Sequence, residues 1–469
     1  MAPTTDIFSS LPQSILSTIV SLIPFKEAVR TSILSISWID IFKFTSNVEF
    51  DEAFFVKDDQ TYRIRQSQRK AFLKFMSLWI TNHTETIVNK FSLRLSTPGK
   101  AKRVVRNCIS FATKYGVKDL ELDFCDPKFD CYFTTNHINH EALFELPPHV
   151  YVHTCLESLK LFSCSFVETK LIYFHTLKEI SLGWMEVKLS TIKTLLSNCE
   201  ALESLSLKRC WNSDDFDLGD ESPRLRKLVV DRCLFRSNSR YFIVNAPNLS
   251  YFYYSGLNNN FLVMDVRSLV MEEEILDFSI EFEGHALFLY KLVEDHISGV
   301  SVLTVCNYFL QVIPTGGCFL RMPCQLYVRS LIMKTSLDQD EFLGITFLLN
   351  SCPELEHLTM ELGLPQKFLD YELPENFNPK RFWTDHARDY KCMVYTLREI
   401  EIKGFTGSKN EICVLTYFIT TGRVLKKITI NISKDAIIDQ YGRFDSYLSG
   451  MIDMLMNQRA SKYLEILIF

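Results

Sequence analysis

The sequence predicts an α/β repeat fold with a small helical unit at its N-terminus, and three observations support this prediction. A short apolar motif recurs along most of the chain at a spacing that suits one strand per repeat. Polar turns precede several copies of the motif and follow apolar stretches, as Asn350 to Leu355 does. Before the first copy, residues 6–44 place apolar residues three and four positions apart, which indicates helices.

Residues 6–50 are predicted to form three short helices. Leu11-Pro12 opens the first helix, because proline fits a first helical turn, and Pro24 ends it. We expect a second helix over Lys26 to Thr31 and a third from about Ser35 to Phe44. A unit of about 40 residues buries too little surface to be stable alone, so a partner or the rest of the chain is expected to cover part of it. The alternative is a helical cap that protects the first strands of the larger core.

Residues 51–86 are interpreted as a helical linker between this unit and the repeats. A helix from about Ser67 to His83 would place large apolar side chains on one face. They are Phe72, Phe75, Met76, Trp79 and Ile80.

Residues 87–364 carry the recurring motif apolar-x-x-apolar-x-apolar. Most of its spacings fall in or near the period of about 20–29 residues that is typical of leucine-rich repeats. Alternate strand residues would point inward, and stacked repeats would merge them into one core. The copies begin at Val88, Val117, Leu156, Leu177, Leu202, Leu225, Leu249, Val266, Val300, Val328 and Leu355, with weaker matches at Val266 and Val300.

The repeat period breaks over residues 365–390, which are interpreted as an insertion or linker. Its aromatic residues Tyr371, Phe377, Phe382 and Trp383 are expected to be exposed. An ordered recognition loop is the alternative to a variable linker. After it, an apolar stripe from Phe444 to Met456 predicts a last helix, followed by a closing strand at Leu464 to Phe469.

Composition excludes several classes of function. A formal net charge of −5 gives no overall basic footprint, so we expect neither nucleic acid nor a membrane as a partner. The uncharged stretch Ile297 to Leu320 contains glycines, a proline and polar residues, and it is interpreted as a buried strand and a loop. The 14 cysteines form no C-x-x-C pair, which favours reduced, buried thiols in the cytoplasm or the nucleus.

One cluster resembles a set of metal ligands: Cys125, Cys131, His137, His140, His149, His153 and Cys155. Zinc sites usually contain a closely spaced cysteine pair, which this cluster lacks. We therefore expect no metal and no cofactor. Phosphate loops, dinucleotide fingerprints and hydrolase motifs are absent as well, so no catalytic residue is predicted.

Two parts of the sequence carry specific motifs. Residues 6–50 contain Leu11-Pro12-x-x-Ile15-Leu16, Leu22-x-Pro24, Glu27 to Ser32, Leu34-Ser35 and Trp38. Residues 391–469 contain Leu397 to Gly407, Asn410-Glu411, Val424 to Ile430 and Arg459-Ala460-Ser461. With these motifs the chain resembles a family of plant proteins that join an F-box to leucine-rich repeats and a C-terminal FBD region. The chain departs from the family at Gln13-Ser14, where an acidic pair is frequent, and at Ile36-Ser37, where basic residues are usual.

The resemblance implies a non-catalytic substrate-recognition subunit of a Skp–cullin–F-box ubiquitin ligase. The F-box would dock on the Skp adaptor, which connects it to the cullin and RING subunits, and the repeats would bind a target protein. The residues expected to form or support the adaptor-binding face are Leu11, Pro12, Ile15, Leu16, Ile19, Leu22, Pro24, Val29, Leu34 and Trp38. The alternatives are a repeat scaffold with a degenerate F-box that does not bind the adaptor, and a small-ligand receptor on the same scaffold.

Overall fold

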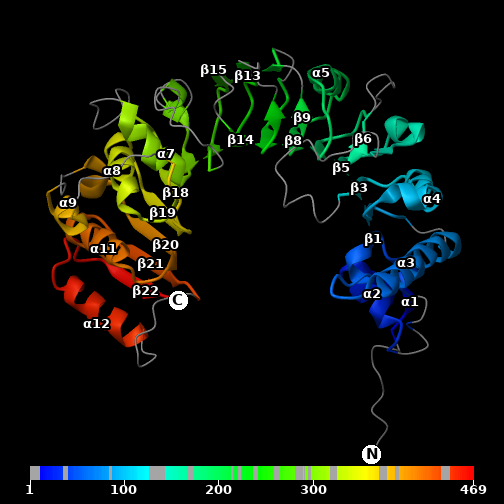
Figure 1. The fold of residues 1–469 in the computed structure, drawn as a ribbon, viewed down its shortest axis with the longest axis horizontal. Helices are drawn as coiled ribbons and strands as arrows, with labels where there is room; N and C mark the ends of the chain where they lie inside the picture. Colours follow the sequence, from blue (N-terminus) through cyan, green and yellow to red (C-terminus); the bar gives the residue numbers. More distant parts are fainter. Residues whose placement is uncertain are drawn as a thin grey trace, which may run out of the picture. The chain divides into compact units, whose positions relative to one another are not determined.

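A computed structural model describes most of the chain and divides it into two compact units, Met1–Ser213 and Asp214–Phe469. Each unit contains parallel strands and helices (Figure 1). The described residues are 11–34, 38, 41–83, 87–125, 143–166, 174–212, 215–219, 223–235, 241–257, 263–279, 289, 291–293, 297–316, 325–368, 378–385, 390–434 and 444–469.

The first unit begins with two short α-helices, α1 (Gln13–Ser21) and α2 (Phe25–Thr31). A proline with extended ψ precedes each helix, and its carbonyl accepts the first helical hydrogen bonds. The described part of the third predicted helix has 3-10 geometry, at Trp38 and in η3 (Ile41–Phe44). Strand β1 (Asn47–Asp51) follows after two further residues.

The predicted linker helix is confirmed and is longer than expected: α3 spans Tyr62–Asn82. Phe72, Met76 and Trp79 are buried, and Phe75 and Ile80 are partly buried. The extension at its N-terminus carries polar residues, so apolar spacing alone could not indicate where the helix begins.

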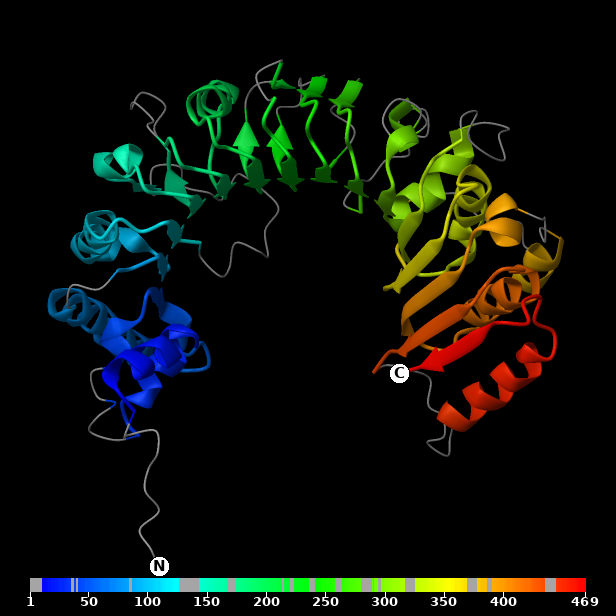
Figure 2. The ribbon, with the colours of Figure 1, turned by 180° about the vertical axis from the view of Figure 1, so that it is seen from behind.

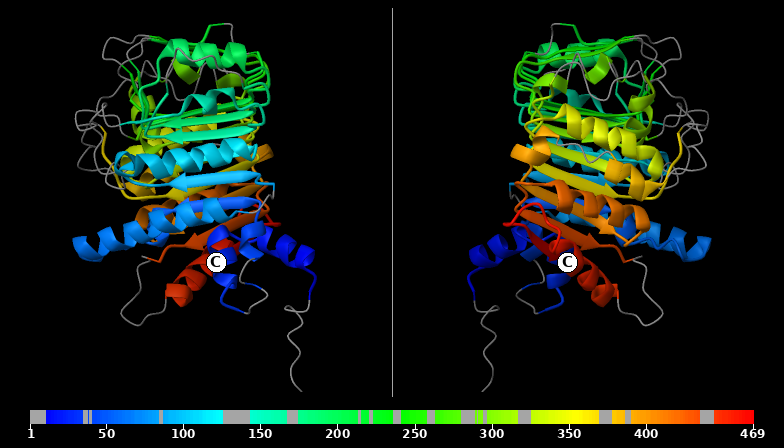
Figure 3. Two further views of the ribbon diagram at one scale, coloured as in Figure 1. Left: turned by 90° about the vertical axis from the view of Figure 1, so that its right-hand side faces the viewer. Right: turned by 90° about the vertical axis from the view of Figure 1, so that its left-hand side faces the viewer.

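Parallel strands of the first unit lie side by side in register, in chain order (Figure 3). They are β1, β2 (Lys90–Arg94), β3 (Asp119–Asp123), β5 (Ser158–Phe162), β7 (Glu179–Gly183) and β8 (Ser204–Lys208). Helices α4 (Lys102–Lys114) and α5 (Leu189–Asn198) belong to the same unit. Its short elements are η4 (Glu52–Phe54), η5 (Pro98–Ala101), β4 (Phe144–Glu145), η9 (Pro148–Val152), β6 (Cys164–Ser165) and β9 (Trp211–Asn212).

The second unit repeats the arrangement with its own parallel strands. They are β11 (Lys227–Asp231), β14 (Tyr251–Ser255), β16 (Glu273–Asp277), β17 (Val302–Val305), β18 (Ser330–Thr335), β19 (His357–Leu362), β20 (Glu399–Phe405), β21 (Lys427–Ile432) and β22 (Glu465–Ile468). Its described α-helices are α7 (Asn307–Val312), α8 (Phe342–Ser351), α9 (Pro379–Asp385), α10 (Lys391–Tyr395), α11 (Lys409–Thr421) and α12 (Phe444–Met456). A smaller sheet contains β10 (Phe216–Asp217), β13 (Tyr241–Asn245) and β15 (Val263–Arg267). The remaining short elements are β12 (Leu234–Phe235), η10 (Ile297–Gly299), η11 (Ile313–Gly316) and η12 (Gln339–Glu341).

The predicted α/β repeat is confirmed, because the apolar positions of the motif form the inward face of the strands. In the first unit, for example, Leu159, Ile180 and Leu205 are paired neighbours, and all are fully buried. The same pattern continues past the predicted repeats: Ile400 and Ile402 pair with Ile428 and Ile430 in β20 and β21.

One predicted copy of the motif is wrong. The copy at Val266 would turn Leu269 inward, but Leu269 is 86% exposed and follows β15 of the smaller sheet. The strand at this place is β16, whose inward residues are Glu274 and Leu276. A glutamate at an inward position hid this repeat from a search for apolar residues.

The expectation of exposed aromatic residues in 365–390 is also wrong for the two that the structure describes. Phe382 and Trp383 lie on α9 and are buried. Trp383 packs on Phe342, with ring centroids 5.1 Å apart, and on Tyr417 at 4.8 Å. Aromatic contacts of this kind attach α9 to the body of the unit. Tyr371 and Phe377 lie outside the described residues.

The last predicted helix and the uncharged stretch also have counterparts in the structure. The apolar stripe at Phe444 forms α12, and the closing strand is β22. The described part of the stretch from Ile297 forms β17 and the short helix α7, with Val300 and Leu303 buried. None of the helices in the described part of the chain has the length and apolar composition that a membrane crossing requires.

Candidate functional site

The helices α1 and α2 share a small core that supports the candidate adaptor-binding face. This core contains Leu16, Val20, Ala28, Trp38 and Ile41, and Leu11, Ile23 and Phe42 pack against it. Two of the predicted face residues, Leu16 and Trp38, are therefore buried inside the unit. They can hold the face in shape, but they cannot contact a partner without a rearrangement.

Other predicted residues are open to solvent. Leu22 is 80% exposed and Leu34 is 67% exposed, and Ile15 is exposed as well. Pro12 and Pro24 are exposed, while Leu11, Ile19 and Val29 are partly buried. Ile33 is 84% exposed as well, although the predicted adaptor-binding residues do not include it. Its position four residues after Val29 is the sequence signal that could have identified it.

Polar side chains around this face are satisfied locally. The hydroxyl groups of Ser17, Thr18 and Ser21 donate to backbone carbonyls three or four residues earlier, at 2.7 to 2.9 Å. Such bonds within a helix leave the hydroxyl groups little need for water or for a partner. The exposed Glu27–Arg30 ion pair, at 2.8 Å, also joins neighbours on one helix. The exposed leucine and isoleucine side chains on α1 and directly after α1 and α2 are therefore the groups of this face that gain most from being covered.

An aromatic cluster joins the N-terminal helices to the first strands. The ring of Phe25, the first residue of α2, lies 5.6 Å from both Phe50 and Trp79 in edge-on contacts. Phe50 on β1 in turn contacts Phe91 on β2 at 5.8 Å. Because Phe25, Phe50 and Phe91 are buried, the helices are packed onto the sheet of the first unit.

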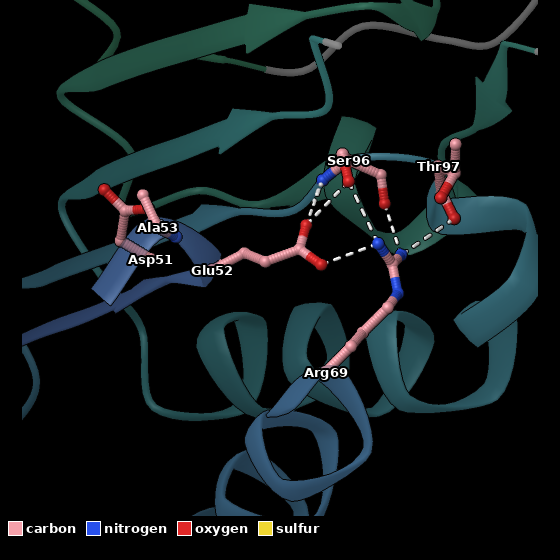
Figure 4. Close-up of polar contacts among 6 residues, drawn as sticks. All are labelled: Asp51, Glu52, Ala53, Arg69, Ser96 and Thr97. Atoms are coloured by element: carbon pink, nitrogen blue, oxygen red, sulfur yellow. Dashed lines mark hydrogen bonds and ion pairs between the residues drawn. The ribbon is translucent and has the colours of Figure 1, made fainter. Parts of the chain in front are cut away.

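A set of polar contacts, called the clamp below, also connects α3 to the first strands (Figure 4). The backbone N–H and the hydroxyl of Ser96 donate to Glu52 Oε2 at 2.8 and 2.7 Å. Arg69 Nη1 on α3 donates to Glu52 Oε1 at 2.6 Å and to Ser96 Oγ at 2.9 Å. Arg69 Nη2 donates to the carbonyls of Ser96 and Thr97. Asp51 fixes the turn that carries Glu52, because its carboxylate accepts from the N–H of Ala53 at 2.8 Å. The clamp ties the linker helix to the segments after β1 and β2.

The outward face of the strands in the first unit is polar. Lys160, Ser181 and Ser206 are paired neighbours there, and charged residues dominate the earlier strands. Arg94 lies within 4.0 Å of Asp51, Glu121 and Asp123. The hydrogen bond to Glu121 raises the pKa of Arg94 further, so this group stays charged.

Two glutamates in the second unit brace the connections from a strand to the next helix. Glu411 on α11 accepts from the backbone N–H groups of Thr406 and Gly407 at 2.8 and 2.9 Å, and from the Thr406 hydroxyl at 2.6 Å. Glu341 accepts in the same way from the N–H and hydroxyl of Ser336, at 3.0 and 2.8 Å. This gives Glu411, part of the sequence match to FBD regions, a role in local structure.

The cysteine and histidine cluster gives no metal site among the residues that the structure describes. His149, His153 and Cys155 line a cavity of about 560 Å³ beside the C-terminal end of α4. Burial lowers the pKa values of both histidines, which favours their neutral forms. Cys131, His137 and His140 lie outside the described residues. The prediction of buried thiols is confirmed for Cys199, Cys210, Cys233 and Cys352.

Comparisons with known proteins match nearly the whole chain. A family model described as At1g61320/AtMIF1, LRR domain, matches residues 79–463. F-box protein At3g62230 of Arabidopsis thaliana is 31% identical over 436 residues, which cover 91% of each chain. Putative F-box/LRR-repeat protein At1g56400 of the same plant is 30% identical over 434 residues, covering 89% of this chain and 87% of its own.

The name of a third relative includes the FBD region. F-box/FBD/LRR-repeat protein At1g78750 of Arabidopsis thaliana is 24% identical over 450 residues, covering 91% of this chain and 89% of its own. The similarity to each of the three relatives thus covers about nine tenths of this chain.

Proposed function

Because the chain belongs to the plant F-box/leucine-rich-repeat family, we propose that it is the substrate-recognition subunit of a Skp–cullin–F-box ubiquitin ligase. The observation that carries this proposal is a set of exposed apolar side chains: Ile15 on α1, Leu22 directly after α1, and Ile33 and Leu34 just after α2. In this proposal the face docks on the Skp adaptor, and the adaptor connects the chain to the cullin and RING subunits in the cytoplasm or the nucleus.

The exposed side chains suit a protein partner on energetic grounds. Covering a fully exposed leucine contributes about 1.5–3 kcal/mol of hydrophobic free energy. Leu22 and Leu34 are both more than half exposed, so each can gain much of that amount when an adaptor covers it. The buried Leu16 and Trp38 contribute indirectly, because they hold α1 and α2 together.

The chain supplies proximity in this proposal and performs no chemistry itself. Holding a target lysine near a charged ubiquitin-conjugating enzyme raises its effective concentration. That contribution requires a firm connection between the adaptor-binding helices and the repeats. The Phe25–Phe50 contact and the Glu52–Arg69 clamp support such a connection within the first unit.

Reconstitution tests the proposal directly. The purified chain is mixed with a plant Skp adaptor, a cullin and a RING subunit, and assembly is followed by size-exclusion chromatography. We expect one complex that contains all four proteins. Separate elution of a well-folded chain would contradict the proposal.

One observation favours a second candidate, a repeat scaffold whose F-box does not bind the adaptor. The first turn of α1 contains no acidic residue, because Gln13-Ser14 stand where the family often has an acidic pair. The reconstitution separates the two candidates, since the scaffold would stay alone.

A further inference from the structure

Positive charge is concentrated on two neighbouring helices of the first unit. Helices α3 and α4 lie side by side on the same side of the strands (Figure 2). Five lysine or arginine residues belong to α3, one to η5 and four to α4, and these three elements contain no aspartate or glutamate. The whole chain, in contrast, has a formal net charge of −5. The charge of these helices is therefore opposite to that of the chain.

Ring contacts fix the register of the two helices. The ring of Trp79 on α3 lies 5.6 Å from that of Phe111 on α4. The ring of His83, directly after α3, lies 5.2 Å from that of Tyr115, directly after α4. The second pair lies four residues beyond the first along both segments, so α3 and α4 run parallel.

The same register brings four of the cations to matching levels. It places Lys70 level with Lys102, and Lys74 level with Arg106, and all four side chains are exposed. Residues four positions apart on a helix are about 6 Å apart along its axis, and packed helices lie about 8–10 Å apart. Lys70, Lys74, Lys102 and Arg106 thus form a compact group, which is called the basic face below.

The chain supplies no counter-charge to the basic face. Among the described residues, Arg69 of α3 pairs with Glu52, but none of the four cations of the basic face forms an ion pair. Each helix also holds two of these cations four positions apart, where like charges repel each other and destabilise a helix. The cluster therefore costs stability in the chain alone, and a negatively charged partner would remove that cost.

The arrangement suits several separate carboxylates better than other anions. The four cations are divided between two helices, so each can pair with its own carboxylate, whereas a single phosphate group would require them to converge. Ala71 and Asn107, exposed beside these cations, offer no aromatic ring on which a nucleic-acid base could stack. The negative net charge of the chain opposes binding to an extended polyanion such as DNA or an anionic membrane.

We propose that the basic face binds an acidic segment of the target protein, which presents aspartate or glutamate side chains to both helices. This inference rests on the proposed function, because that function supplies the target. An acidic helix lying along α3 and α4 would present carboxylates on successive turns at the same spacing of about 6 Å. The clamp at Arg69 attaches α3 to the first strands, so the basic face is formed before the target binds.

A random peptide library tests this proposal, with the complete chain as bait. Phage that display twelve-residue peptides are selected on the purified protein, and enriched peptides are synthesised for affinity measurements. We expect enrichment of peptides with several aspartate or glutamate residues. Replacing these residues by asparagine and glutamine should weaken binding about 10-fold or more, and added salt should weaken binding of the acidic peptides.

Variants assign the binding to the basic face. Lys74→Glu/Arg106→Glu should weaken binding of the selected peptides about 10-fold or more, because it places like charges opposite each other. Lys74→Gln/Arg106→Gln should weaken binding less and should not lower the melting temperature, since it removes repulsion within each helix. Lys391→Glu/Lys409→Glu is the matched control, because it changes the net charge equally at two exposed lysines of the second unit. It should bind as the wild type does.

Three results would overturn the proposal: no enrichment of acidic peptides, equal affinities of the wild type and Lys74→Glu/Arg106→Glu, or equal losses in that variant and the control. A DNA duplex and phosphatidylserine vesicles are tested as well. Binding of either one more tightly than the peptides, abolished in Lys74→Glu/Arg106→Glu, would assign the basic face to that polyanion and overturn the proposal.

Binding to the Skp adaptor is measured on the same samples. Failed peptide selection with intact adaptor binding rejects the basic face alone, whereas failed adaptor binding rejects the proposed function.

Discussion

Glu274 on β16 lies directly beside Leu303 on β17, at an inward position of the second unit. Phe252 on β14 is its paired neighbour on the other side, and Glu274 itself is only 2% exposed. A carboxyl group thus occupies a core position that apolar residues fill in the adjoining strands. Burial raises the pKa of Glu274 to about 8.

The first prediction concerns the dependence of stability on pH. The folded protein holds the Glu274 proton up to about pH 8, whereas the unfolded chain releases it near its ordinary value of 4.5. The free energy of unfolding, as far as it depends on Glu274, is therefore highest below about pH 4.5. It decreases as the pH rises to about 8, by a few kcal/mol in total. Glu274→Gln removes this dependence and should raise the melting temperature most at pH 8.

Thermal melts of the wild type and Glu274→Gln between pH 5 and pH 8.5 check this prediction. The difference between their melting temperatures should grow with pH. Glu465→Gln, at an exposed position on β22, is the control and should follow the wild type. A constant difference across the range would contradict a buried, protonated Glu274.

The second prediction concerns the clamp between Glu52 and Arg69. Both side chains are nearly buried, and Arg69→Met would leave the Glu52 carboxylate with fewer donors. Breaking a buried pair in this way costs about 3–5 kcal/mol, and partial access to water reduces that cost. We expect a loss of about 2 kcal/mol or more in the free energy of unfolding, measured by urea denaturation.

Arg30→Met supplies the comparison for the clamp. Its exposed pair with Glu27 has a similar N–O distance, and exposed pairs contribute only about 0–1 kcal/mol. Equal losses for Arg69→Met and Arg30→Met would show that the clamp does not stabilise the junction.

A third prediction tests the role of Glu411 in the C-terminal region. Glu411→Ala removes the acceptor for two backbone N–H groups and one hydroxyl, so we expect a loss of about 1–3 kcal/mol in stability. Hydrogen exchange of the Thr406 and Gly407 amides should accelerate at the same time. Unchanged protection of these amides would argue against the bracing role.

A fourth prediction concerns the close approach of α7 and α8. A Cβ atom on Gly344 would overlap the backbone carbonyl of Leu310, which cannot move without disturbing α7. Gly344→Ala should therefore lower the stability of the second unit by about 1–3 kcal/mol or more. Gly363→Ala is the control, because nothing lies within 4 Å of its Cβ position. Similar melting temperatures for the two variants would contradict the close packing.

The sequence predicts the repeats well, because inward positions such as Leu159 and Ile180 must be apolar in nearly every strand. The prediction fails at Val266, because the strand of that repeat has Glu274 at an inward position, where the motif requires an apolar residue. Burial of Phe382 and Trp383 was also unpredictable, because their partners Phe342 and Tyr417 lie in distant parts of the sequence.

The sequence identifies which residues belong to the candidate adaptor-binding segment, but not which of them are exposed. Helical spacing identifies Leu16 and Leu22 as apolar members of one segment, yet Leu16 faces the small core and Leu22 faces solvent. The clamp is invisible in the sequence, because Arg69 lies 27 residues before Ser96 and only the fold brings them together.

The most direct measurement is the affinity of the purified chain for a plant Skp adaptor, compared with that of the Leu22→Ala/Leu34→Ala variant. Both leucines are exposed, so their replacement should leave the fold intact. If they are binding residues, the double variant should bind about 100-fold or more weakly, while Leu269→Ala, an equally exposed leucine of the second unit, should bind as the wild type does. Equal affinities for the wild type and a folded double variant would contradict the adaptor-binding face.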